Sequence, residues 1–105
     1  MTIPAILRRI VQATLDEYCS KKVPAHVKHQ LRLSHKTRGN NVTLVEERPF
    51  FKDKSKWTRM AIAQFRYDSD DSTWTLYCAD RNRRWHKFRP IRSTNDFEKL
   101  LRAVE

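Results

Sequence analysis

The sequence predicts an α+β fold, a five-stranded antiparallel β-meander with an N-terminal and a C-terminal helix packed on one of its faces. Apolar side chains recur at helical spacing near both ends of the chain, whereas the middle contains several runs that alternate with period two. Clusters of Gly, Asn, Asp and Ser separate these runs by connections too short for parallel neighbours. Two helices cover only one face of such a sheet, so we expect the other face to be partly open.

The first helix is expected over residues 3–20, with Pro4 in its first turn, where a missing N–H is tolerated. Pro24 follows it and favours an extended chain at Val23. The apolar positions of this helix should form one buried stripe, which comprises Ile3, Ile6, Leu7, Ile10, Val11, Thr14, Leu15, Tyr18 and Cys19.

The first two strands are expected over residues 29–38 and 41–48, with Pro49 ending the second. A two-residue Gly39-Asn40 loop suits the positive φ values of a hairpin turn. This register puts Val42 and Leu44 on the same face as Leu31 and Leu33. Residues 50–56 carry mixed charge without a period, which indicates a surface loop.

The third strand is expected over residues 57–67, and the acidic turn of residues 69–72 leads into the fourth. A four-residue loop there pairs Phe65 with Leu76 and Tyr67 with Trp74. The apolar face would then hold Ala61, Ala63, Phe65, Tyr67, Trp74, Leu76 and Cys78. The opposite face would hold Thr58, Met60, Ile62, Gln64, Arg66, Thr73, Thr75 and Tyr77.

The turn after Asp80 admits two registers for the fifth strand. A two-residue loop aligns Trp85 with Cys78, whereas a three-residue loop aligns Phe88 with Leu76, and the two put Trp85 on different faces. We favour an inward Trp85. After Pro90, the Ser-Thr-Asn sequence at 93–95 and the acids behind it predict the start of the closing helix.

Length and composition set the class of protein. The 105 residues predict a single domain spanning residues 1–105. No apolar run approaches the roughly 20 residues of a membrane helix, and the N-terminus lacks a signal-peptide cleavage site. The two cysteines, Cys19 and Cys78, lie far apart, which is typical of a reduced, cytoplasmic protein. The sequence does not specify an oligomeric state.

The net charge of +10 is the unusual global property, and it favours polyanionic partners such as RNA, DNA or an acidic protein. The stretch from Arg81 to Arg92 contains no acid and interleaves Trp85, His86 and Phe88 with arginine and lysine. Cations beside aromatic rings are the combination that binds single-stranded nucleic acid. The candidate nucleic-acid-binding residues are Arg32, Lys36, Arg38, Arg66, Tyr77, Arg81, Arg83, Arg84, His86, Lys87 and Arg89.

No metal site and no cofactor are predicted. The spacing of Cys19, His26, His29 and His35 matches no zinc finger. A magnesium site made of Glu46, Glu47 and Asp53 is not expected, because adjacent residues such as Glu46 and Glu47 should point to opposite faces of a strand. The single glycine excludes the dinucleotide and P-loop fingerprints.

For catalysis, the best available group is His86, Tyr77, Arg84 and Lys87, which resembles the residue types of small RNA-cleaving toxins. The leading hypothesis is a non-enzymatic module that contacts nucleic acid through a basic sheet face. The alternatives are a protein–protein adaptor and a toxin-like, metal-independent RNase.

The strand region also contains a set of distinctive short motifs: Trp57-Thr58-Arg59, Ile62-Ala63, Phe65-Arg66-Tyr67, Trp74-Thr75-Leu76-Tyr77, Asp80-Arg81-Asn82 and Trp85-His86-Lys87-Phe88. Together with Gly39-Asn40-Asn41-Val42-Thr43-Leu44 and Glu46-x-Arg48-Pro49, they resemble short bacterial proteins of a domain of unknown function, family three-zero-two-four. The resemblance covers most of the chain. It implies no activity and no catalytic residues, because the family has none established.

Overall fold

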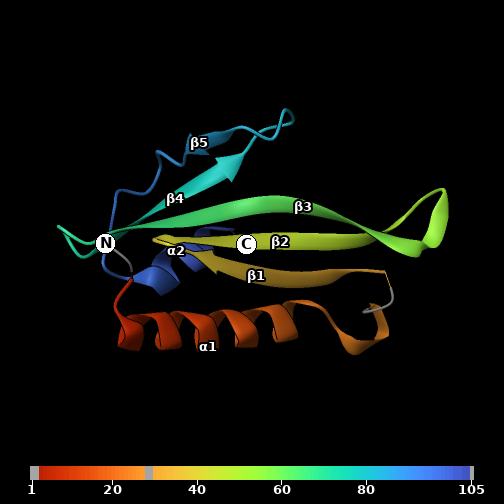
Figure 1. Ribbon diagram of the computed structural model, residues 1–105, viewed down its shortest axis with the longest axis horizontal. Helices are drawn as coiled ribbons and strands as arrows, with labels where there is room; N and C mark the ends of the chain where they lie inside the picture. The colour runs from red at the N-terminus through yellow and green to blue at the C-terminus, as the bar shows by residue number, and fades with distance from the viewer. Residues whose placement is uncertain (1–2, 28–29, 105) are drawn as a thin grey trace.

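The computed structural model describes residues 3–27 and 30–104. Its elements are, in chain order, α1 (Ala5–Lys22), the 3₁₀ turn η1 (Ala25–Val27), β1 (Arg32–Arg38), β2 (Asn41–Phe50), β3 (Asp53–Asp68), β4 (Thr73–Ala79), β5 (Trp85–Lys87) and α2 (Phe97–Val104). The strands form one antiparallel sheet in the sequential order β1-β2-β3-β4-β5 (Figure 1). The predicted α+β meander is confirmed.

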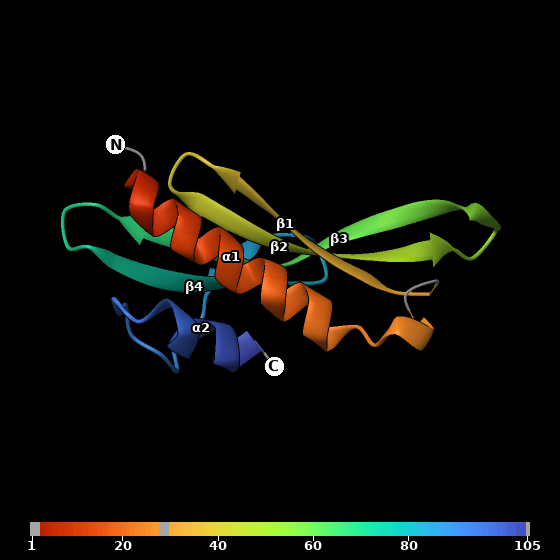
Figure 2. The ribbon, with the colours of Figure 1, turned by 90° about the horizontal axis from the view of Figure 1, so that it is seen from below.

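Both helices lie on the same side of this sheet, as the view from below shows (Figure 2). α1 packs chiefly against β1, and α2 packs against β4. The core lies between the helices and the sheet and consists of Ile3, Val11, Leu15, Val42, Leu44, Ala63, Phe65, Tyr67, Trp74, Leu76, Phe97, Leu100 and Leu101. The opposite side of the sheet is called the open face below.

An aromatic cluster joins α2 to the sheet. The Phe97 ring lies 4.7 Å from the Phe65 ring and 5.1 Å from the Trp74 ring, centroid to centroid. Trp74 also contacts Tyr67 across the β3–β4 hairpin. Tilted and edge-on pairs of this kind add to the stabilisation that comes from burying the rings.

The two predicted hairpin registers are confirmed. Gly39 adopts a φ of +58°, and Val42 lies on the helix side with Thr37 as its partner on β1. Phe65 pairs with Leu76 across the acidic turn. β1 begins at Arg32, later than predicted, because Gln30 and Leu31 donate their backbone N–H groups to the Val27 carbonyl in a turn. The predicted first residue, His29, lies outside the described residues.

The buried stripe of α1 is narrower than predicted. Ile6 and Ile10 are 77% and 58% exposed, whereas Val11 and Leu15 are buried. A helix that lies along one edge of the sheet presents a single line of side chains to the core, so the flanking isoleucines remain in solvent. The helix also runs to Lys22, and Pro4 is its N-cap residue rather than part of its first turn.

The surface loop predicted at residues 50–56 does not exist. β2 continues to Phe50, the turn contains Phe51 and Lys52, and β3 begins at Asp53. Pro49 pairs with Trp57 inside this extension rather than ending the strand. None of residues 48–50 and 53–58 is buried, and a strand without a buried face has no reason to alternate.

A β-bulge at Ile62 corrects the predicted faces of β3. The pairing shifts between Leu44↔Ala63 and Val45↔Ala61. Because side chains alternate along β2, Ala61 leaves the face of Ala63, and Ile62 packs against the core instead. Before the bulge the alternation is therefore reversed, and Trp57 and Arg59 take the open face in place of Thr58 and Met60.

The inward position of Trp85 is wrong. Trp85 pairs with Ala79, and His86 pairs with Cys78, so Trp85 lies on the open face. Phe88 donates its backbone N–H to Leu76 and packs against the core, which is the alternative register. The reason is the three-residue loop of that alternative, residues 81–83, which is closed by a hydrogen bond from the Asp80 backbone N–H to the Arg84 carbonyl and in which Arg83 adopts a φ of +63°.

The closing helix is confirmed, but it begins at Phe97, and Asp96 rather than the Ser-Thr-Asn sequence at 93–95 caps it. The Asp96 carboxylate accepts a hydrogen bond from the Lys99 backbone N–H, and Thr94 exchanges two backbone hydrogen bonds with Trp74. These contacts fix the chain to β4 immediately before α2 begins.

We expect Phe97→Ala to lower the free energy of unfolding by about 3–5 kcal/mol, because it removes a buried ring and leaves a cavity beside Phe65 and Trp74. The matched control is Phe51→Ala, whose ring is 80% exposed and whose loss should cost less than about 0.5 kcal/mol. Urea unfolding followed by tryptophan fluorescence measures both. Equal midpoints for the two variants would contradict the assigned packing.

Candidate nucleic-acid interface

A row of paired residues crosses the open face from one edge of the sheet to the other. In strand order it is Lys36, Thr43, Gln64, Tyr77 and Lys87. Residues directly opposite each other on neighbouring strands share a face, so both lysines and the residues between them point the same way. Four strand spacings separate the end residues, or about 19 Å.

A second row lies beside the first and contains Arg38, Asn41, Arg66 and Thr75. Pairing places six cations on the open face, namely Arg32, Lys36, Arg38, Arg59, Arg66 and Lys87, against two carboxylates, Glu47 and Asp68. Glu47 lies 3.7 Å from Arg59 and accepts a hydrogen bond from Ser34. The face therefore carries an excess of positive charge.

Arg66 is held at the centre of this face by its neighbours. Its Nε donates to Gln64 Oε1 at 2.7 Å, and Gln64 Nε2 donates in turn to Thr43 Oγ1 at 3.1 Å. The guanidinium lies 3.8 Å from the centroid of the Tyr77 ring. Within the described part of the chain, the two η-nitrogens of Arg66 have no hydrogen-bond partner, and they remain available to an anion.

The same arrangement recurs where β1 meets the extended hairpin. The Arg32 guanidinium lies 3.8 Å from the Trp57 ring. Two of the aromatic rings on the open face, Tyr77 and Trp57, are thus covered by arginines and are not free to stack on bases. Trp85 is half-buried at the β5 edge. The geometry favours contact with phosphates over base stacking.

The β4–β5 loop presents three of the predicted arginines, Arg81, Arg83 and Arg84, and all three are exposed. Asp80 organises this loop. Its Oδ1 accepts the backbone N–H groups of Asn82 and Arg84, and its Oδ2 lies 2.6 Å from His86 Nε2. These contacts, led by the Arg84 amide and then the His86 side chain, lower the pKa of the Asp80 carboxyl below its usual value.

Arg89 lies apart from the open-face rows. It lines a shallow pocket of about 550 Å³ beyond β5 together with Lys87, Ile91, Arg92 and Ser93. The Ser93 hydroxyl is hydrogen-bonded to the Thr75 hydroxyl, which connects this pocket to the second row. Arg89 and Lys87 therefore extend the positive surface around the β5 edge.

The structure separates the residues that were considered for catalysis. Tyr77 pairs with Lys87 on the open face, whereas His86 pairs with Cys78 and takes the opposite side. The cross-strand contact between Tyr77 and His86 is absent, and His86 contacts Asp80 instead. A general acid–base pair made of these two side chains is therefore not assembled.

The thiols are not activated either. Burial raises the pKa of the Cys19 and Cys78 thiols, and Asp16 adds to the effect at Cys19. His35 lies 2.6 Å from the Asp16 carboxylate, which links β1 to α1. His29 lies outside the described residues, and the residues that are described contain no cluster of metal-ligating side chains.

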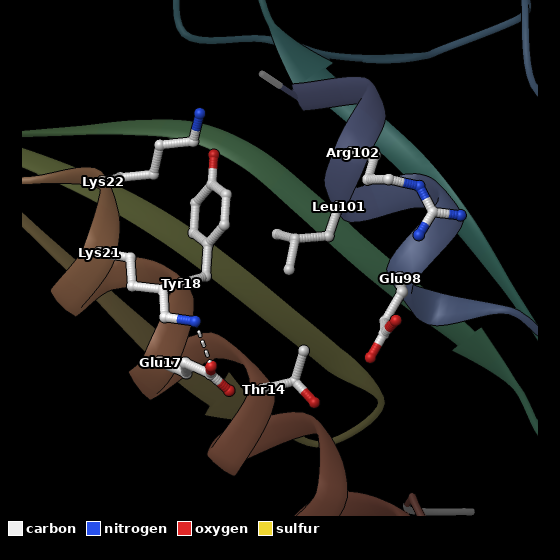
Figure 3. A pocket seen from close by; sticks show the side chains of 8 residues that line it. All are labelled: Thr14, Glu17, Tyr18, Lys21, Lys22, Glu98, Leu101 and Arg102. Atoms are coloured by element: carbon white, nitrogen blue, oxygen red, sulfur yellow. Dashed lines mark ion pairs between the residues drawn. The ribbon is translucent and has the colours of Figure 1, made fainter.

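A pocket of about 420 Å³ opens between α1 and α2 on the other side of the molecule (Figure 3). Its lining mixes both charges: Thr14, Glu17, Tyr18, Lys21, Lys22, Glu98, Leu101 and Arg102. Lys21 Nζ lies 2.6 Å from Glu17, and this pair raises the pKa of the lysine and lowers that of the glutamate. Mixed charge gives this pocket no preference for a polyanion.

Sequence reasoning missed the cations of the extended β2–β3 hairpin. Lys52, Lys54 and Lys56 were assigned to a loop, yet Lys54 and Lys56 lie on β3 and Lys52 lies in the turn of a protruding hairpin. Arg59 was missed because the bulge at Ile62 could not be anticipated. The available signal was the basic composition of residues 48–59 around Phe50 and Phe51.

We expect the backbone amides of Asn82 and Arg84 to report a titration with a midpoint below the ordinary aspartate pKa of about 3.9. The pKa of Asp80 is lower in the folded state, so its carboxylate stabilises the loop above about pH 4, and this contribution is lost as the pH falls through the lowered value. Amide NMR shifts across pH 2–6 measure it.

Asp80→Asn should abolish the titration of both amides, whereas Asp71→Asn, in the exposed β3–β4 turn, should leave it intact. Persistence of the titration in the Asp80 variant would show that another group controls the loop.

A family model described as "Domain of unknown function (DUF3024)" matches residues 3–105. No curated protein and no solved structure matches. No helix within residues 3–27 and 30–104 has the length and apolar character needed to cross a membrane. Since the match spans almost the entire sequence, the chain belongs to the DUF3024 family of domains of unknown function.

Proposed function

We propose that this protein is a non-enzymatic module that binds nucleic acid through the open face of its sheet, in a cytoplasmic setting that its free thiols suit. The observation that carries the proposal is the cross-strand pairing of the open face, which holds six cations against two carboxylates, with four of the six cations in the two rows. The electrostatic attraction of a polyanion is therefore expected to be strongest on this side of the molecule.

The dimensions of the face suit a phosphate backbone. Each strand of duplex DNA carries one negative charge per about 3.4 Å of the helix axis, so a row of about 19 Å spans roughly five phosphates of one strand. Lys36 and Lys87 are exposed at the ends of the row, and Arg66 lies near its middle with free η-nitrogens. Contacts of this kind position a protein on nucleic acid without reading its sequence.

The fixed positions of two open-face arginines also support binding to nucleic acid. Binding through arginine normally costs side-chain entropy, because long side chains must be ordered. Stacking on Tyr77 and hydrogen bonding to Gln64 already order Arg66 in the free protein. Arg32 is similarly placed on Trp57. The ordering cost at these two positions is therefore reduced before the ligand arrives.

The open face favours this function over the two alternatives. The acid–base pair considered for an RNase, Tyr77 and His86, is not assembled, because the two side chains point to opposite faces. An adaptor would need a contiguous apolar patch, whereas the side chains on the open face are mainly cationic or polar.

The test is a triple variant, Lys36→Ala/Arg38→Ala/Lys87→Ala, which removes three exposed cations from the open face. We expect weaker binding to fluorescein-labelled nucleic acid in anisotropy titrations. The slope of log K against log salt should fall by about 2–3, since each lost phosphate contact removes about 0.9.

The matched control is Arg8→Ala/Arg9→Ala/Lys99→Ala, which removes the same charge from the exposed surfaces of the two helices. Its salt slope should stay close to that of the unmodified protein. Equal losses in the two variants would attribute binding to net charge alone, and absence of binding to RNA and DNA even at low salt would overturn the proposal.

A further inference from the structure

The extended hairpin formed by residues 48–58, called the ribbon here, projects beyond the rest of the sheet (Figures 1 and 2). β1 pairs with β2 only as far as Glu47, and β4 pairs with β3 only from Ala63 onward. Among the residues that the structure describes, the two strands of the ribbon pair only with each other. An isolated pair of strands is only marginally stable in water, so the ribbon depends for its stability on the sheet from which it extends.

The ribbon is strongly basic and has an apolar tip. Its charged residues are four cations, Arg48, Lys52, Lys54 and Lys56, and one carboxylate, Asp53. Asp53 is occupied locally, because its Oδ1 accepts both the backbone N–H and the hydroxyl of Ser55. At the tip, Phe51 is 80% exposed and its ring lies 5.2 Å from that of Phe50.

The size of the ribbon matches a groove of duplex DNA. Three paired positions beyond Glu47, at about 3.4 Å each, give a projection of roughly 10 Å before the turn. The major groove of B-form DNA is about 12 Å wide and 8.5 Å deep, and it admits a two-stranded β-ribbon. The tip is long enough to reach base edges while its lysines remain beside the phosphates.

The ribbon is also continuous with the rest of the proposed interface. Arg81 and Arg83 line a cleft of about 410 Å³ with residues of β3 just before and at the bulge, Met60, Ala61 and Ile62. The β4–β5 loop and the tip of the ribbon lie toward the same end of the sheet (Figure 1). A duplex engaged by the ribbon would therefore lie close to these loop arginines.

Self-association through the bare edges of the ribbon is disfavoured. Lysines and proline along an edge strand oppose pairing with another copy, and Lys54, Lys56 and Pro49 lie there. The charge and the exposed tip are explained better by an anionic groove than by a second protein chain.

We propose that the ribbon inserts into a groove of double-stranded DNA and makes this protein prefer duplex DNA to other nucleic acids. The inference rests on the proposed function and specifies its ligand. A-form RNA has a deep, narrow major groove that side chains do not enter, and a single strand offers no groove. The Trp57 ring at the base of the ribbon is covered by Arg32, which removes a stacking site for single-stranded bases.

The experiment compares a 20-base-pair DNA duplex, the single DNA strand and the RNA duplex of the same sequence by anisotropy at fixed salt. The unmodified protein should bind the DNA duplex most tightly. Lys52→Ala/Lys54→Ala/Lys56→Ala should weaken duplex DNA binding at least tenfold at 50 mM salt and reduce the salt slope by about 2–3. Its preference for the duplex over the single strand should disappear.

Phe51→Ala provides a second, non-ionic readout. It should weaken duplex binding a few-fold and leave the salt slope unchanged, because a ring at a base edge releases no counterions. The Arg8→Ala/Arg9→Ala/Lys99→Ala variant serves as the charge control. Urea unfolding should show that these exposed substitutions leave the fold intact.

The outcomes separate the two proposals. If the ribbon variant binds duplex DNA like the unmodified protein while Lys36→Ala/Arg38→Ala/Lys87→Ala does not, the ribbon inference is overturned and the open-face function stands. A preference of the unmodified protein for single strands or for the RNA duplex also overturns the ribbon inference. Failure to bind any of the three ligands overturns both.

Discussion

The contact of Phe97 with Phe65 and Trp74 is the interaction on which the architecture depends. It fixes α2 on the side of the sheet that α1 also occupies, and Leu100 and Leu101 complete the core there. The two helices supply enough apolar surface to cover one face of five strands and no more. The asymmetry between a buried face and a charged face is therefore a consequence of packing.

The charged face is ordered by interactions that a hydrophobic core does not supply. Gln64 and Thr43 connect β3 to β2, and the guanidinium of Arg66 extends the chain of contacts to Tyr77 on β4. Each such contact is weak, since an exposed cation–π pair contributes only about 0.5–1 kcal/mol. Their value lies in holding positive charge at fixed positions. The lysines at the two ends of the row remain exposed and adapt to the ligand.

The parts of the fold that the sequence predicted are those in which one face is buried. Alternation of Phe65, Tyr67, Trp74 and Leu76 determined the β3–β4 register, because a one-residue slip would expose every one of these rings and side chains. The Gly39 turn was equally predictable, since its positive φ favours glycine.

The parts that were missed lack this constraint. The ribbon has no buried face, so its sequence shows no period and was interpreted as a loop. The position of Trp85 depends on a loop built around Asp80 and on a left-handed Arg83, and neither has a signature strong enough to fix the loop length. For the candidate interface, residue types alone identified the cations. Only the strand register showed that Lys36 and Lys87 share a face and that His86 does not.

The placement of α1 and α2 side by side under the sheet has a consequence for synthesis. The contacts within each hairpin join residues that are close in sequence, so the hairpins can form as soon as their strands leave the ribosome. The helix-facing side of Phe65 and Trp74, however, stays uncovered until α2 has emerged. The native core is therefore completed only after Phe97, Leu100 and Leu101 have been added to the chain. During that interval the nascent chain exposes the kind of surface to which chaperones bind.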